Sequence, residues 1–99
     1  MIRYRVEMPQ AVRTLIRQLP PELKSKVKIG WRSIAVNPYR AKALRDELAG
    51  LRSYRIGRSR VIYRIVGSMV QIVALGPRVD IYERAATELS KALRKDKPQ

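Results

Sequence analysis

Three short apolar runs separated by glycine turns constrain the fold of this chain more than any other feature. The runs are Leu51–Ile56, Arg60–Val66 and Met69–Leu75. Each is rich in valine, isoleucine or tyrosine, the residues that favour strands. Gly57-Arg58-Ser59 joins the first run to the second, and Gly67-Ser68 joins the second to the third. Short strands joined by tight glycine turns predict an antiparallel meander.

The residues before the meander predict one strand and two helices. Apolar and charged side chains alternate over residues 2–8, which is the period of a half-buried strand. Apolar residues then recur at helical spacing over residues 12–19 and again over residues 23–34. Pro20-Pro21 separates these two helices, and Asn37-Pro38 ends the second one. We expect the two helices to form a hairpin.

The segments on either side of the meander carry weaker patterns. Residues 39–50 show no clear period, and we interpret them as a loop with a short helical turn. After Gly76-Pro77, residues 79–94 have the period of a short amphipathic helix. The predicted order is β-α-α-β-β-β-α in one α+β domain over residues 1–99: N-terminal strand, two-helix hairpin, three-stranded antiparallel meander and C-terminal helix. The two helices would cover one face of the sheet, and we expect function on the other, partly open face.

The composition excludes several kinds of chemistry. The chain has no cysteine and no histidine, which excludes disulfides, thiolate or imidazole metal sites, and an imidazole base. We therefore expect neither a metal nor a cofactor, and any catalysis would depend on arginine, lysine, tyrosine or carboxylates. No apolar run approaches the roughly 20 residues of a membrane-spanning helix, and the N-terminus lacks the apolar region of a signal peptide. We expect no membrane contact and a cytoplasmic location.

Positive charge dominates the chain. With 22 lysines and arginines against 8 acidic residues, the net charge is +14, a balance that usually reflects a polyanionic partner. Strand alternation over residues 58–65 places Arg58, Arg60 and Arg64 on one face. Because arginines are costly to bury unpaired, this face is either solvated or directed at phosphate. The candidate RNA-binding residues are Arg40, Lys42, Arg45, Arg52, Arg58 and Arg64.

A solvated face that keeps the protein in solution is the simpler interpretation of these charges. However, arginine outnumbers lysine by 15 to 7, and the planar arginine fork suits bidentate phosphate contacts and stacking on bases. We therefore favour contact with nucleic acid or the ribosome. Tyr54, Tyr63 and Tyr82 lie close in sequence to these arginines and are candidates for stacking on unpaired bases. Tyr63 and Trp31 fall on apolar faces, which fits a place in the core better.

Residues 48–65, with the sequence LAGLRSYRIGRSRVIYRI, resemble the signature of the RelE/ParE toxin superfamily. That signature combines a Leu-x-Gly lead-in, an aromatic-Arg strand, a short turn and an Arg-Val-Ile-Tyr strand. The resemblance continues at residues 74–78, where the family ends its last strand with Gly-x-Arg, and at residues 80–82, where its final helix begins. Chain length, basic charge and the predicted element order also agree, so the resemblance covers essentially the whole chain.

The resemblance implies a toxin of a type II toxin–antitoxin pair, silenced by a small cognate antitoxin protein. RelE-like members enter the A site of the ribosome and cleave mRNA there, whereas ParE-like members inhibit DNA gyrase. We favour the RelE-like branch, with the ribosome and mRNA as partners. The alternatives are a ParE-like gyrase inhibitor and a non-catalytic RNA- or ribosome-binding module.

The resemblance also implies a catalytic set, whose members are Arg55, Arg60, Arg78 and Tyr82. The expected reaction is metal-independent: the RNA 2′-hydroxyl attacks the adjacent phosphate, and the cations stabilise the developing charge. Gly57 and Pro77 depart from the family pattern, because a basic residue often stands at the first position and His or Lys at the second. The alternatives are phosphate binding without chemistry for Arg55 and Arg60, and packing at the start of a helix for Tyr82.

Overall fold

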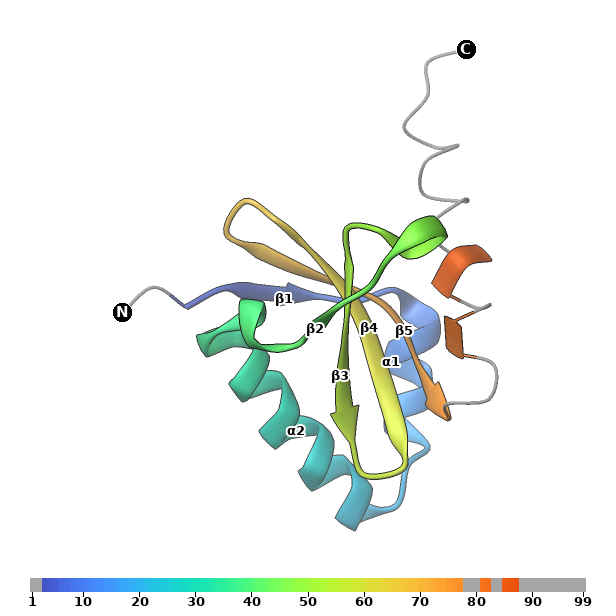
Figure 1. Ribbon diagram of the computed structural model, residues 1–99. Helices are drawn as coiled ribbons and strands as arrows, with labels where there is room; N and C mark the ends of the chain where they lie inside the picture. Colours follow the sequence, from blue (N-terminus) through green and yellow to red (C-terminus); the bar gives the residue numbers. More distant parts are fainter. Residues whose placement is uncertain (1–2, 78–80, 83–84, 88–99) are drawn as a thin grey trace.

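Two helices pack on one face of a five-stranded sheet in the computed structural model (Figure 1). The structure describes residues 3–77, 81–82 and 85–87. The strands are β1 (Arg5–Glu7), β2 (Lys42–Ala43), β3 (Leu51–Ile56), β4 (Ser59–Val66) and β5 (Met69–Pro77). The helices are α1 (Gln10–Arg17) and α2 (Pro21–Val36), and two 3₁₀ turns, η1 (Pro38–Arg40) and η2 (Asp46–Leu48), flank β2. The predicted α+β architecture is confirmed.

The strand order of the sheet is β1-β5-β4-β3-β2. β3, β4 and β5 form the predicted antiparallel meander through two-residue turns at Gly57-Arg58 and Gly67-Ser68. Glycine leads each turn with a φ of +60°, a backbone region that other residues rarely adopt. Ser59 belongs to β4, so the first turn is one residue shorter than the sequence indicated. β1 pairs in parallel with β5, which places β1 at the edge opposite β2.

Residues 39–50 differ from the predicted loop, because they contain a short strand. β2 pairs Lys42 with Ser53 and Ala43 with Arg52. Two residues carry no periodicity of their own, so their pairing with β3 alone defines them as a strand. The short helical turn predicted in this segment is present as η2.

The predicted C-terminal helix lies only partly within the described residues. Residues 81–82 and 85–87 are helical, and the rest of the predicted range 79–94 lies outside the described residues. At the other end, β1 is shorter than the predicted strand, and Ile2 lies outside the described residues. Over the described ranges, no helix is both long enough and apolar enough to cross a membrane.

The main core lies between the helices and the sheet. Its buried residues are Val12, Val27, Ile34, Ile56, Val61, Tyr63, Val70, Ile72 and Leu75. The core position of Tyr63 is confirmed: the side chain is fully buried, and its hydroxyl donates a 2.5 Å hydrogen bond to the Pro38 backbone oxygen. Trp31 is half-buried against the same core. Gly30 allows α2 to approach β3 closely, because a Cβ there would lie 2.7 Å from Ile56 Cδ1.

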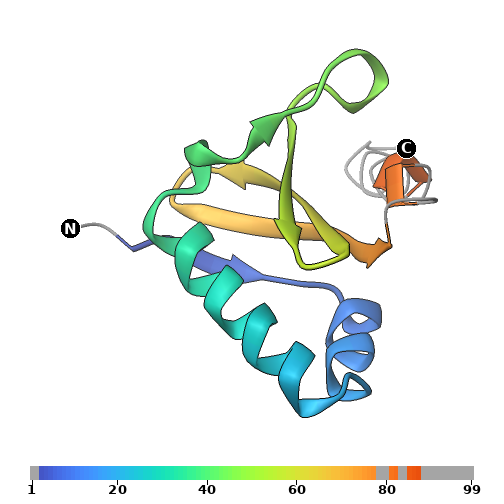
Figure 2. The ribbon, with the colours of Figure 1, turned by 60° about the horizontal axis from the view of Figure 1, so that its bottom comes forward.

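A second, smaller apolar cluster lies on the opposite face of the sheet. Its buried residues are Leu51, Ile62, Val73, Ala74, Ile81 and Ala85. Leu44, Leu48 and Tyr82 pack against them. Figure 2 shows the helical residues 81–82 and 85–87, drawn in orange, on the side of the sheet away from α1 and α2. This face is therefore partly covered by the chain itself, whereas the sequence pattern predicts only that it would be partly open.

Candidate functional site

The register between β3 and β4 decides which arginines share a face. Arg55 on β3 lies directly opposite Arg60 on β4, and residues opposite each other in an antiparallel pair point to the same side of the sheet. Leu51 lies opposite Arg64 in the same way. Because Leu51 belongs to the cluster on the face away from the helices, all three arginines point to that face. We call Arg55, Arg60 and Arg64 the arginine face.

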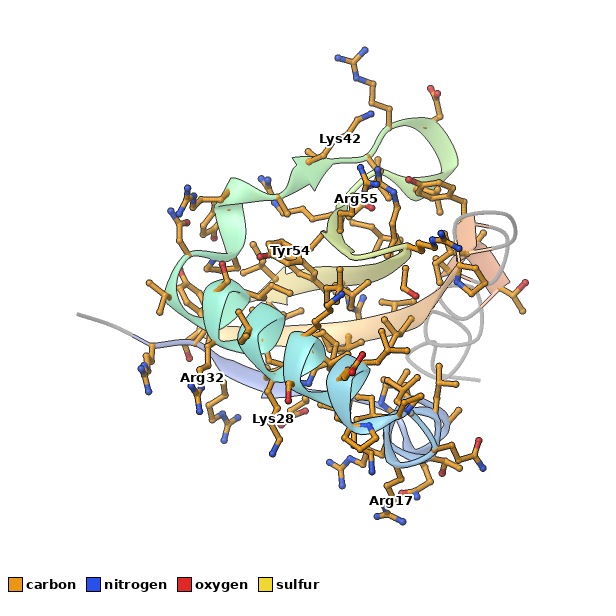
Figure 3. The ribbon with its side chains drawn as sticks, turned by 90° about the horizontal axis from the view of Figure 1, so that it is seen from below. Arg17, Lys28, Arg32, Lys42, Tyr54 and Arg55 are labelled. Atoms are coloured by element: carbon orange, nitrogen blue, oxygen red, sulfur yellow. The ribbon has the colours of Figure 1, made fainter. Side chains whose placement is uncertain are left out.

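Figure 3 shows the two sides of β3 directly. Tyr54 points toward α2 and packs on the main core, whereas its neighbour Arg55 points to the other side of the sheet. Lys42 on β2 lies opposite Ser53, so this lysine adds a fourth cation at the edge of the arginine face. Lys42 and Arg55 are both exposed to solvent.

Arg60 is held in place by a polar partner on the neighbouring strand. Its Nη1 donates a 3.1 Å hydrogen bond to the Ser53 hydroxyl. Ser53 is buried, with only 3% of its surface exposed. A single hydrogen bond of this kind restrains the guanidinium and leaves most of its five N–H donors for a ligand.

The other two arginines have partners of different kinds. Arg64 Nε donates to Gln71 Oε1 across the β4–β5 pair. Arg55 Nε donates a 3.1 Å hydrogen bond to the backbone oxygen of Gly57, which bends this exposed side chain toward the β3–β4 turn.

No described carboxylate lies in an ion pair with Arg55, Arg60 or Arg64. The one ion pair between described residues joins Arg5 and Glu7 on β1, at 3.8 Å. Cations on one face that no described carboxylate neutralises favour the binding of a phosphate.

Tyr82 reaches the same side of the sheet from the C-terminal segment. It is half-buried and packs against the apolar cluster that contains Leu51 and Ile62. These two residues lie on β3 and β4, the strands that carry the arginine face. Arg78, the remaining member of the predicted catalytic set, lies outside the described residues. The structure thus brings three of the four predicted catalytic residues to one face: Arg55, Arg60 and Tyr82.

Arg52 lies apart from the arginine face. Residue alternation on β3 places it on the helix side, opposite Tyr63. Its Nη1 donates hydrogen bonds to the backbone oxygens of Tyr39 at 3.0 Å and Ala41 at 2.8 Å, and its guanidinium carbon lies 5.2 Å from the centre of the Tyr39 ring. Arg52 therefore holds η1 and the start of β2 against the sheet, and its donors are occupied by the protein.

The other predicted RNA-binding residues occupy exposed loops and turns. Arg40 ends η1, Arg45 precedes η2, and Arg58 is in the β3–β4 turn. The stacking role considered for Tyr54 and Tyr63 does not fit the structure, because both rings pack on the helix side of the sheet. Of the three tyrosines, Tyr82 alone lies on the side of the arginine face.

Two polar residues at the site were not predicted from the sequence. Ser53 and Gln71 hold Arg60 and Arg64. Alternation along β3 would have placed Ser53 on the same face as Arg55. Which arginine each residue meets depends on the register between strands, however, and periodicity within one strand carries no register.

Comparison with known proteins bears on the family of this chain. The family described as "ParE toxin of type II toxin-antitoxin system, parDE" matches residues 2–82. Toxin RelG of Mycobacterium tuberculosis is 36% identical over 85 residues, which cover 82% of this chain and 98% of that protein.

Solved structures show the same fold. The crystal structure of the toxin–antitoxin complex RelBE2 from Mycobacterium tuberculosis contains a chain that is 32% identical to this one, with a TM-score of 0.68 over 78% of this chain and all of that chain. A mutant of the E. coli toxin RelE in the free state has the same TM-score over 96% of this chain and 99% of that one, at 15% identity. The chain therefore belongs to the ParE toxin family of type II toxin–antitoxin systems, within the RelE/ParE superfamily.

Proposed function

We propose that this toxin is a metal-independent endoribonuclease that cleaves mRNA on the ribosome. The observation that carries the proposal is the direct pairing of Arg55 with Arg60 on a face that Tyr82 also reaches. Two guanidinium groups and a phenol on one surface can bind a phosphodiester and take part in transfer of its protons. The ribosome would supply the alignment of the RNA that such a shallow site lacks.

The chemistry assigns a separate task to each group. The 2′-hydroxyl of the RNA attacks the adjacent phosphorus, a bond to the 5′-oxygen of the next nucleotide breaks, and a cyclic phosphate remains. Arg60, restrained by Ser53, stabilises the negative charge that grows on the phosphate oxygens. Arg55 adds charge from the exposed end of β3, and Tyr82 exchanges a proton with the attacking or leaving oxygen. Arg78 joins this set on the basis of the sequence pattern.

A cognate antitoxin is part of the proposal. The M. tuberculosis relative was solved as a toxin–antitoxin complex, and a protein with a net charge of +14 suits an acidic or amphipathic partner. We expect the toxin to co-purify with the product of a neighbouring reading frame. Failure to recover any such partner would count against this part of the proposal.

The test is to add the purified chain to a translating extract and to map new mRNA 5′ ends with and without ribosomes. We expect cuts in the translated frame that require ribosomes. Arg60→Ala should reduce cutting by about 100-fold or more, the usual loss on removal of one charge-stabilising donor. Arg3→Ala, an exposed arginine before β1 at the opposite edge of the sheet, is the matched control. Intact mRNA with folded wild-type protein would overturn the proposal.

Gyrase inhibition is the second candidate, because the family that matches residues 2–82 is described as ParE toxin. A supercoiling assay with purified DNA gyrase separates the two activities. Inhibition of supercoiling without new RNA ends would favour the ParE-like function. RNA or ribosome binding with neither activity would identify a non-catalytic binding module.

A further inference from the structure

We propose that the outer surface of the helical layer is a second RNA-binding surface, which contacts the phosphate backbone of folded RNA. Its residues are Arg13, Arg17, Lys24, Lys28 and Arg32, and we call them the helix row. This surface lies on the layer opposite the arginine face. The proposal goes beyond the nuclease assignment and does not depend on which group performs catalysis.

The helix row follows from spacing along each helix. Lys24, Lys28 and Arg32 on α2 are four residues apart, as are Arg13 and Arg17 on α1. Residues four apart lie on one side of a helix, about 6 Å apart along its axis at a rise of roughly 1.5 Å per residue. The result is a line of regularly spaced cations on each helix.

Exposure and direction agree with this spacing. Lys24 is half-buried, and the other four side chains are exposed. Figure 3 shows Arg17, Lys28 and Arg32 pointing away from the sheet, on the side opposite Lys42 and Arg55. The two basic surfaces therefore face in opposite directions.

Helix stability does not account for this row. Like charges four residues apart repel each other and destabilise a helix, and Lys24 lies in the first turns of α2, where the helix dipole disfavours a cation. The sequences of α1 and α2 contain one acidic residue, Glu22. No ion pair between described residues involves either helix. The described residues therefore supply no negative charge that pairs with the helix row, and an external anion would supply it.

The chemistry of the row favours a nucleic-acid backbone over other anionic partners. A linear polyanion matches a line of cations, whereas protein interfaces are centred on clustered aromatic and aliphatic anchors. Beside the row, the large apolar side chains that α2 exposes are separate from one another, and they are Leu23, Ile29 and Val36. A membrane surface requires an apolar helix face that enters the lipid. Most apolar side chains of α1 and α2 instead pack on the sheet, through residues such as Val12, Val27 and Ile34. The exposed apolar side chains of α2, Leu23, Ile29 and Val36, are six and seven residues apart and form no continuous apolar face.

The experiment measures binding of a fluorescent RNA hairpin, with a stem of about 20 base pairs, by anisotropy over a range of salt concentrations. The test variants are Lys28→Gln and the double variant Lys28→Gln/Arg32→Gln. Lys26→Gln is the matched control, because Lys26 is exposed on the same helix but about 160° around its axis from Lys28. Each single variant removes one charge from α2 and introduces a good helix former.

We expect Lys28→Gln to weaken binding several-fold and to reduce the slope of log affinity against log salt by about 1, and the double variant to reduce it by about 2. Lys26→Gln should leave the slope unchanged. Equal effects of Lys26→Gln and Lys28→Gln would overturn the proposal, since they would reflect net charge alone. Unchanged RNA binding by the double variant would overturn it too, and displacement of the RNA by polyglutamate at equal charge concentration would point to an acidic protein instead.

The same variants separate this inference from the nuclease assignment. If wild-type protein fails to cut mRNA while Lys28→Gln still lowers hairpin affinity, the nuclease assignment fails and the helix row stands. If Arg60→Ala abolishes cutting while Lys26→Gln and Lys28→Gln bind RNA equally, the helix row fails and the nuclease assignment stands. Circular dichroism of each variant confirms that α2 is intact.

Discussion

Ser53 shows how much one small side chain contributes to the candidate site. Its hydroxyl is buried in β3 and accepts a 3.1 Å hydrogen bond from Arg60. Without this acceptor, the Arg60 side chain would sample several rotamers. A smaller fraction of the molecules would then hold the guanidinium in the one orientation that a bound phosphate requires. If Arg60 acts in cleavage as proposed, Ser53 is a positioning residue that acts through Arg60.

We predict that Ser53→Ala lowers the rate of ribosome-dependent cleavage by about 10- to 100-fold, because a hydrogen bond to a charged group contributes about 1.5–3 kcal/mol. The loss should fall on kcat and leave KM nearly unchanged. Ser53→Thr, which keeps the hydroxyl, should restore activity. In the Arg60→Ala background, Ser53→Ala should cause no further loss; an additional 10-fold loss there would show that Ser53 acts independently of Arg60.

Tyr63 links the pH of the solution to the stability of the fold. Burial raises the pKa of its phenol to about 12, whereas a phenol in an unfolded chain ionises near pH 10. The folded state holds this proton more tightly, so the contribution of Tyr63 is complete below about pH 10 and is lost as the pH rises toward 12. Its hydrogen bond to the buried Pro38 oxygen disappears at the same time.

We predict that Tyr63→Phe destabilises the protein by about 1–3 kcal/mol at pH 8, the usual cost of leaving a buried acceptor without its donor. Urea denaturation at pH 8, 10 and 11 should show the gap between wild type and variant narrowing as the pH rises. A gap that stays constant over this range would contradict the role assigned to the Tyr63 proton.

At the scale of the elements, Gly30 allows a close approach of α2 to β3. A Cβ at position 30 would lie 2.7 Å from Ile56 Cδ1 and 3.1 Å from Ile56 Cγ1. Alanine at this position gains about 1 kcal/mol of helix propensity but overfills the contact, at a cost of about 1–3 kcal/mol. The overpacking is the larger effect, because Ile56 is itself buried in the core.

We predict that Gly30→Ala destabilises the protein by about 1 kcal/mol, measured by chemical denaturation. Ile56→Val removes the Cδ1 atom and alone costs about 0.5–1.5 kcal/mol. The double variant should be more stable than the sum of the two single changes predicts, since the valine makes room for the new methyl group. Strictly additive effects would show that the α2–β3 contact is not the cause.

The elements differ in how far the sequence alone could predict them. β3, β4 and β5 carry their own alternation and end at glycine turns, and their predicted ranges agree with the structure to within two residues. β2 could not be predicted, because two residues have no period. Arg52 lies on the helix side of the sheet because it is opposite Tyr63. Its hydrogen bond to the Tyr39 backbone oxygen in η1 is a long-range contact. Alternation thus correctly predicts that Arg60 and Arg64 share a face, but Arg58, predicted on the same face, lies in the β3–β4 turn. Arg55 joins the face through the β3–β4 register, and the partners of each arginine likewise require the assembled sheet.

At the scale of the whole molecule, positive charge is distributed over both layers. The arginine face lies on one side of the sheet, and the helix row lies on the outer side of the helices. A charge of +14 on 99 residues carries a cost in self-repulsion that a single small site would not require. If both proposals hold, the protein sits between two RNA segments, one held along its backbone by the helix row and the other presented to Arg55 and Arg60.

The parallel pairing of β1 with β5 has a consequence for the synthesis of the protein. β1 leaves the ribosome first, yet most of the chain lies between Arg5 and its partner Met69. β5 also supplies Val70, Ile72 and Leu75 to the main core. A nascent chain that ends before this strand therefore lacks both the strand between β1 and β4 and a complete core. If the toxin cleaves mRNA as proposed, each cut in its own message before the codons of β5 yields a fragment without this strand, and the enzyme limits its own production without releasing active pieces.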